Sequence, residues 1–278
     1  MIRESAKGVF APSEKLARAD GHPVNAGPPW ESDKKMQMAS LASAPWLVDH
    51  DGDGDLDFYI GNIEGRVMLV LNEGDAKSPK FANTATALQA GGTEIKVEGG
   101  DAGPCVGDWD GDGRLDLLVG AGDGSVTLFK NTAKAGLAAY AAGRELVAKS
   151  AQDHGNPVAF GAQPTGTGSR SKVCVADWNG DGLVDLLLGD VYYRSQAPKV
   201  LSEELTKRRT SLIEERTKLS KQIDPGQVKD DFDWEKFQNE HKEVFARMNE
   251  VSTELYELED GVDVLGTVWV LLRKPLQR

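Results

Sequence analysis

Four carboxylates within nine residues are the feature of this sequence that points most directly to chemistry. Residues 108–116 read Asp-Trp-Asp-Gly-Asp-Gly-Arg-Leu-Asp, with carboxylates at positions 1, 3, 5 and 9. Gly111 and Gly113 can take the positive φ angle that a tight loop requires. Oxygen ligands brought to one point repel each other unless a cation lies among them, and Ca²⁺ binds about 6–8 such oxygens. We therefore predict a calcium-binding loop.

The same stretch occurs twice more, at residues 49–57 and 177–185. A single copy would be compatible with a surface turn rich in Asp and Gly, but three copies argue against that interpretation. An EF-hand would need a bidentate Glu at position 12 of the loop. Position 12 is occupied here by Ile60, Val119 and Leu188. The loops are therefore predicted to connect strands and not helices.

Short apolar segments surround each loop in the same order. A strand is expected before each loop, and a second one follows it and ends in Gly. A third strand is expected after the next Gly, at 65–71, 124–129 and 266–272, and a fourth around Phe81 and Tyr140. Residues 8–11, around Phe10, repeat this fourth-strand pattern. Four short antiparallel strands in each of several repeats predict an all-β fold, a β-propeller with three blades in this chain.

The third repeat contains a long insertion before its third strand. Within it, residues ~200–223 and ~232–259 have apolar residues every seven positions, which favours an antiparallel α-helical coiled-coil hairpin. A turn is expected at 224–226, and Ser202 is the predicted N-cap. The predicted organisation is propeller blades in 1–193, the hairpin in 194–260 and the returning strand in 261–278. The hairpin is interpreted either as a solvated spacer or as an oligomerisation arm.

The pattern Asp-x-Asp/Asn-Gly-Asp-Gly-x-x-Asp, followed by an apolar strand and Gly, resembles the FG-GAP (VCBS-type) repeats of integrin α-chain propellers and many secreted bacterial proteins. Phe160-Gly161 resembles the Phe-Gly element, and Gly120-Ala121-Gly122 stands where that family has Gly-Ala-Pro. The resemblance implies one Ca²⁺ in each loop at the edge of a blade, and so three per chain. Position 7 would contribute a backbone carbonyl in each loop. The implied metal ligands are Asp49, Asp51, Asp53, Asp55, Asp57, Asp108, Asp110, Asp112, Arg114, Asp116, Asp177, Asn179, Asp181, Leu183 and Asp185.

Composition limits the partners and the compartment. The chain has 278 residues and a net charge of −12, which argues against nucleic acid or an anionic membrane surface as a partner. No apolar run approaches the ~20 residues of a membrane span, and no signal peptide is visible. We expect a secreted or periplasmic location, because sites of this type fill at millimolar calcium. Cys105 and Cys174 occupy equivalent positions and are interpreted as buried core residues, with a disulfide as the alternative.

No catalytic motif stands out. The sequence has no Gly-x-Ser-x-Gly, phosphate loop or His-Glu-x-x-His, and its histidines have no recognisable catalytic partner. The favoured function is a non-enzymatic calcium-binding propeller that serves as a protein- or glycan-binding or assembly module. The alternative is a propeller-based enzyme, a lyase or hydrolase, acting on polysaccharide. Trp109 and Trp178, at loop position 2, are expected to pack between blades, with a sugar platform as the alternative. The histidines are His22, His50, His154 and His241.

The strand count predicts assembly. The third repeat lacks a fourth strand before the last residue given, whereas the segment around Phe10 is a fourth strand without a blade of its own. If the N-terminal strand of one chain completes the last blade of another, two chains form a homodimer with six blades. A fragment of a longer repeat protein is the competing interpretation.

Overall fold

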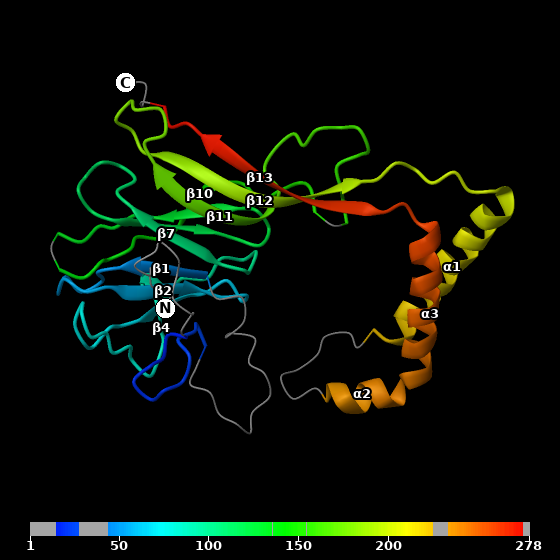
Figure 1. Ribbon diagram of the computed structural model, residues 1–278, viewed down its shortest axis with the longest axis horizontal. Coiled ribbons are helices and arrows are strands. Elements are labelled where there is room, and N and C mark those ends of the chain that lie inside the picture. Colours follow the sequence, from blue (N-terminus) through cyan, green and yellow to red (C-terminus); the bar gives the residue numbers. More distant parts are fainter. Residues whose placement is uncertain (1–14, 28–43, 135, 154, 225–232, 275–278) are drawn as a thin grey trace, which may run out of the picture. The chain divides into compact units, whose positions relative to one another are not determined.

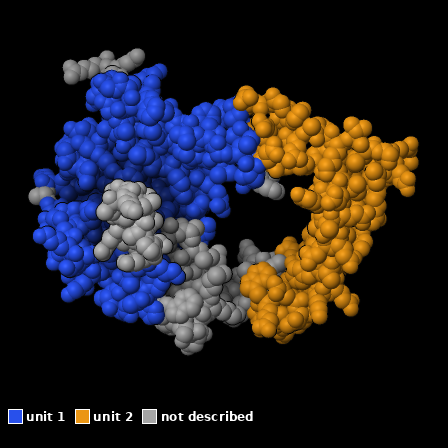
Figure 2. Space-filling view, in the orientation of Figure 1, with its two compact units in different colours: residues 1–156, 164–193, 264–278 blue, residues 157–163, 194–263 orange. Residues whose placement is uncertain are grey.

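The computed structural model describes residues 15–27, 44–134, 136–153, 155–224 and 233–274. The chain divides into two compact units (Figure 2). Unit 1 comprises residues 1–156, 164–193 and 264–278, and unit 2 comprises residues 157–163 and 194–263. The predicted strand around Phe10, the predicted turn at 225–226 and His154 lie outside the described residues.

Unit 1 consists of antiparallel sheets stacked in chain order (Figure 1). Sheet 1 contains β1 (Ala44–Val48), β2 (Asp57–Gly61), β3 (Val67–Val70) and β4 (Thr86–Ala87). Sheet 2 contains β7 (Gly103–Gly107), β8 (Asp116–Gly120), β9 (Val126–Phe129) and β10 (Arg144–Val147). Sheet 3 contains β11 (Ser169–Ala176), β12 (Asp185–Ser195) and β13 (Val262–Leu271). A short hairpin of β5 (Gln89–Ala90) and β6 (Thr93–Glu94) precedes sheet 2. The fold is mainly β, with the four-stranded antiparallel sheets that the repeats predict.

The first two strands of each repeat pair in the same register. Each acidic loop connects the first strand of its sheet to the second, and the position-9 aspartate is the first residue of that second strand. Leu47 pairs with Phe58, Val106 with Leu117, and Val175 with Leu186, at the same place in each pair of strands. The three loops therefore connect strand pairs that have the same register.

The fourth strands do not lie where the sequence places them. Phe81 forms isolated bridges with Asn72 and Arg18, and Tyr140 forms them with Asn131 and Ala90. β4 and β10 begin further along the chain. Both aromatic side chains are buried in cores instead. The Asn side chains explain the shift, because their amide oxygens accept backbone N–H groups just before each aromatic residue and hold the chain in a turn.

The cores of unit 1 lie between consecutive sheets. Val67 of sheet 1 belongs to the same buried cluster as Leu117 and Val119 of sheet 2. Val126 of sheet 2 belongs to a second cluster together with Leu188 of sheet 3. One face of sheet 1 therefore packs on sheet 2, and one face of sheet 2 packs on sheet 3, as in neighbouring blades of a propeller.

Unit 2 is a helical insertion between β12 and β13. It contains α1 (Glu203–Gln222), α2 (Trp234–Glu240) and α3 (Lys242–Leu258). Ser202 caps α1, as predicted, by accepting the N–H of Leu205. The expected second helix is divided at His241, whose φ of −108° and ψ of 18° leave the helical region.

Helices α1 and α3 pack on each other through a small apolar core. Leu212, Val251, Leu255 and Leu258 are buried there. Exposed ion pairs connect the two helices at Arg208–Glu254, Arg216–Glu259 and Arg247–Glu215. Within the described part of the chain, no helix has the length and apolar character to cross a membrane.

Candidate metal centre

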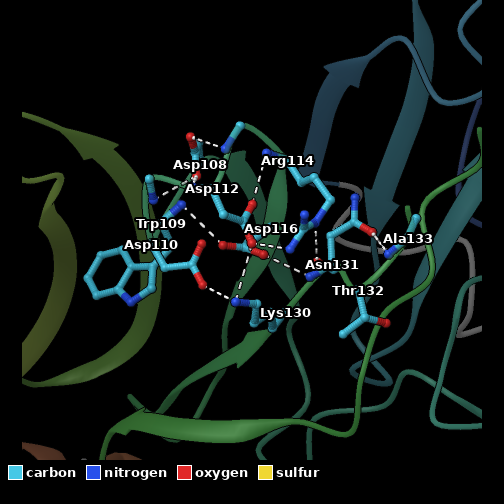
Figure 3. A network of polar contacts seen from close by, with 12 residues as sticks. Asp108, Trp109, Asp110, Asp112, Arg114, Asp116, Lys130, Asn131, Thr132 and Ala133 are labelled. Atoms are coloured by element: carbon cyan, nitrogen blue, oxygen red, sulfur yellow. Dashed lines mark hydrogen bonds and ion pairs between the residues drawn. The ribbon is translucent and has the colours of Figure 1, made fainter. Parts of the chain in front are cut away.

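The position-1 aspartate organises each acidic loop. Asp108 Oδ1 accepts the backbone N–H of Gly111 at 2.9 Å, and its Oδ2 accepts that of Gly113 at 2.9 Å (Figure 3). Both glycines have positive φ angles, 77° and 83°, which a side chain would disfavour. Asp49 and Asp177 accept hydrogen bonds from positions 4 and 6 of their own loops in the same way. All three loops are therefore wound around this carboxylate.

The position-9 aspartate ties each loop to the third strand of its sheet. Asp116 is fully buried. Its Oδ2 accepts the N–H of Trp109 at 3.1 Å, and its Oδ1 accepts that of Asn131, just after β9, at 2.7 Å. Asp57 and Asp185 make the same two kinds of bond in loops 49–57 and 177–185. This carboxylate therefore holds the loop in place as well as facing its centre.

Sequence reasoning missed two residues that support the site. Asn72 and Asn131 donate to the position-9 aspartates with their backbone N–H groups, and their side chains hold the turn that follows. The signal was present, since each Asn lies 15 residues after its aspartate. In the third repeat the equivalent residue is Arg273, which donates to Asp185 at 2.7 Å.

Positions 1, 3 and 9 come together in the first two loops. Asp49, Asp51 and Asp57 offer oxygens that lie within 4.8 Å of one another, and so do the three equivalent residues of loop 108–116. The second triad is Asp108, Asp110 and Asp116. Either triad can hold a metal ion. In loop 177–185, position 3 is Asn179, so an amide oxygen stands where the other loops have a carboxylate.

The position-5 carboxylates stand outside these two triads and turn toward the backbone. Asp53, Asp112 and Asp181 each accept the N–H of the residue two positions later, at 3.0, 3.0 and 2.9 Å. This is the local bond by which Asp favours turns. Of the ligand set that the family resemblance implies, the structure thus gathers positions 1, 3 and 9 most closely.

The chemistry of the donors fits a hard cation. Burial raises the pKa of the Asp57 and Asp116 carboxyls, although backbone hydrogen bonds oppose the shift. Asp55 is also buried, and its carboxylate lies beside the Asn72 side chain. Burial, and next the charge of Asp53, raise the pKa of Asp55. A cation with oxygen ligands, such as Ca²⁺, would offset this accumulation of buried negative charge.

Loop 108–116 differs from the others because it has cationic side chains of its own. The Lys130 ammonium contacts Asp110 and lies 3.3 Å from Asp112 (Figure 3). Arg114 pairs with Asp112, and its Nε donates to the carbonyl of Asn131 at 3.0 Å. The hydrogen bonds to Asp110 and Asp112 raise the pKa of Lys130. The positions equivalent to Lys130 in the other repeats are apolar leucines, so this arrangement is specific to the second loop.

In two pairs of equivalent residues, only one member lies in the packed environment that the sequence predicts for both. Trp109 packs partly into the core, and the Arg273 guanidinium lies 5.2 Å from its ring, whereas Trp178 is exposed. Cys105 is buried as predicted, but Cys174 is exposed, and both thiols are free. The expectation of buried packing is therefore wrong for Trp178 and Cys174. Both lie in the third repeat, on which no further described sheet packs.

Comparison with known proteins identifies the repeats. The profile of the FG-GAP-like repeat matches residues 49–119 and again residues 108–188. Each match runs from one acidic loop through the next, and together the two cover half of the chain. No curated protein and no solved structure matches the chain.

Proposed function

We propose that this chain, which belongs to the FG-GAP-like repeat family, is a non-enzymatic calcium-binding propeller module for binding or assembly. The observation that carries the proposal is the shared geometry of the three loops. In each one, positions 1 and 9 accept backbone hydrogen bonds from the same loop positions. In two of them, three carboxylates converge.

Each loop would hold one Ca²⁺, giving three ions per chain. The carboxylates at positions 1, 3, 5 and 9 and the carbonyl at position 7 are the proposed ligands, with Asn179 at position 3 of the third loop. The bound ion would neutralise the buried carboxylates and stabilise the turn, and it would perform no reaction. Each bound ion would then stabilise the connection between the first and second strands of its blade.

The proposed ligand is a protein or a glycan. Trp178 supports the glycan alternative, because its exposed ring beside loop 177–185 offers a flat surface for stacking against a sugar. A secreted or periplasmic location is also part of the proposal, since extracellular modules bind calcium in the range of roughly 10⁻⁴–10⁻³ M. A homodimer also belongs to this proposal.

A glycan array tests the binding role, followed by affinity measurements on Trp178→Ala. The control is Trp234→Ala in α2, another half-exposed tryptophan, in unit 2. If the wild-type protein binds a glycan, we expect Trp178→Ala to lose at least about tenfold in affinity, because stacking on an aromatic ring contributes on the order of 1 kcal/mol or more. Equal losses in the two variants would remove Trp178 from the binding site.

One observation favours the enzyme alternative enough to test it. His50 Nδ1 lies 2.8 Å from the Tyr59 hydroxyl, which lies 3.2 Å from that of Tyr140, and all three residues line a cavity of about 220 Å³. However, burial raises the pKa of Tyr59 to about 12, and it also raises the pKa of Tyr140. Neither phenol loses its proton near neutral pH, which argues against a tyrosine base. Depolymerisation of a polysaccharide that is abolished in His50→Ala would favour the enzyme.

A further inference from the structure

One face of sheet 3 is apolar and exposed. Along β13, Trp269 and Leu271 pack toward sheet 2, and the alternating residues Val268 and Val270 point to the opposite side. Val268 is 72% exposed. We call this side the outer face. It comprises Cys174, Leu187, Val264, Val268, Val270 and Leu272; Leu187 is half-buried and the others are exposed.

The equivalent residues of the other two repeats are buried. Val268 stands two residues after Gly266, as Val67 follows Gly65 and Val126 follows Gly124. Val67 and Val126 are both 0% exposed.

The cause of that burial is the next sheet along the chain. Sheet 2 covers this side of sheet 1, and sheet 3 covers this side of sheet 2. Cys105, the counterpart of the exposed Cys174, is buried in the second of these interfaces. Among the described residues, this type of face is therefore buried twice, in sheets 1 and 2, and is exposed in sheet 3.

Two glycines give a second, independent indication. A Cβ on Gly61 would lie 2.0 Å from the carbonyl oxygen of Ala102, and one on Gly120 would lie 2.3 Å from that of Ser171. These glycines are needed because the backbone of the next sheet approaches closely. The equivalent Gly189 meets nothing nearer than 3.8 Å, and that atom belongs to its own sheet.

Gly266, like Gly189, lacks the close backbone contact that its counterparts in the other repeats have. Its counterparts Gly65 and Gly124 have positive φ angles and face carbonyl oxygens at 2.2 and 2.1 Å, whereas Gly266 lies within an extended strand with its nearest contact at 3.6 Å. Glycine destabilises a strand interior when nothing requires it. Gly189 and Gly266 therefore fit a face that another backbone covers.

We propose that the outer face is covered by the outer face of a second copy of this chain, about a two-fold axis. The opposite end of the stack does not offer a free sheet, because Phe58, Ile60 and Val70 of sheet 1 are already buried with Val24 and Ala26. An apolar face that is uncovered in one copy is uncovered in the other, so a two-fold contact satisfies both at once. This proposal deepens the assembly role given under the proposed function and rests on it.

Sedimentation velocity in millimolar calcium tests the proposal. The wild-type protein should sediment as a dimer of about 60 kDa, twice the 30.0 kDa chain. Val268→Asp should raise the dimer dissociation constant at least about 100-fold, because it buries an unpaired carboxylate from each copy. Val200→Asp is the control, since Val200 is fully exposed and lies in unit 2. A monomer at all concentrations, or a dimer that Val268→Asp leaves intact, would overturn the proposal.

Two further readouts separate a lost interface from a damaged fold. Gly189→Ala has room within a single chain, so it should keep the melting temperature of the monomer and still weaken the dimer. Cys174 should react with a maleimide several-fold more slowly in the dimer than after dilution or in Val268→Asp. Protection of Cys174 in a monomer would assign the face to another segment of the same chain. A monomer that binds calcium would contradict the dimer and leave the calcium-binding role intact. A protein that binds no calcium would contradict the calcium-binding role, whether it is a monomer or a dimer.

Discussion

Replacing Asp116 with alanine separates the two roles that the position-9 carboxylate has in this fold. Asp116 is a proposed calcium ligand, but it also accepts the N–H groups of Trp109 and Asn131. Neither bond needs a metal ion, because both donors are backbone N–H groups of this chain. Asp116→Ala should therefore destabilise the protein even in the presence of a chelator.

The size of the effect follows from the two donors that lose their acceptor. A buried N–H left without a partner costs about 1–3 kcal/mol. The bond from Asn131 is buried, so its loss is assigned the upper end of this range, about 3 kcal/mol. The bond from Trp109 is partly buried, so its loss is assigned the lower end, about 1 kcal/mol. The sum is about 4 kcal/mol of unfolding free energy, or roughly 8–16 °C in melting temperature for a unit of this size.

Thermal melts followed by circular dichroism, with and without chelator, measure this effect. Asp110→Ala is the matched control, because Asp110 belongs to the same triad and its hydrogen bond is to the Lys130 side chain and not to the backbone. Asp110→Ala should lower the melting temperature mainly in calcium, and Asp116→Ala in both buffers. Equal melting temperatures of the two variants in chelator would refute the structural role of Asp116.

Three further predictions concern individual side chains. Asp112→Ala should leave one calcium fewer bound per chain by calorimetry without changing the other two sites, and three sites of undiminished affinity would count against its assignment as a ligand. Lys130→Met should tighten one calcium site, because it removes an ammonium that competes for the loop carboxylates, whereas Lys134→Met should not; identical affinities in both variants would contradict this. Burial raises the pKa of Cys105 to about 12, so that only Cys174 should be alkylated at pH 8 in native protein diluted until it is monomeric, and mass spectrometry showing both labelled would disprove it.

The acidic loops and their strands were predictable because the same physical constraint is repeated three times. An aspartate at position 9 that begins a strand, and glycines that must have positive φ angles, leave few alternatives for the backbone. The FG-GAP-like assignment rests on the same residues.

The remaining features depend on contacts that a local pattern does not contain. The fourth strands are displaced because the side chains of Asn72 and Asn131 hold turns with residues eight positions away. The second helix is interrupted at His241 although the spacing of apolar residues continues through it. Cys174 occupies the position of Cys105 but not its environment, because burial here depends on the next sheet and not on the residue.

Isothermal titration of the metal-free protein with calcium, combined with melts of the same sample, tests the calcium-binding module most directly. We predict three ions per chain. At ~2 mM free Ca²⁺ and a Kd of roughly 10⁻⁴ M, each site adds about 1.8 kcal/mol of stability, and three add about 5 kcal/mol. The melting temperature should therefore fall markedly when calcium is chelated. A melt that chelator leaves unchanged, with no calcium found by elemental analysis, would contradict the account.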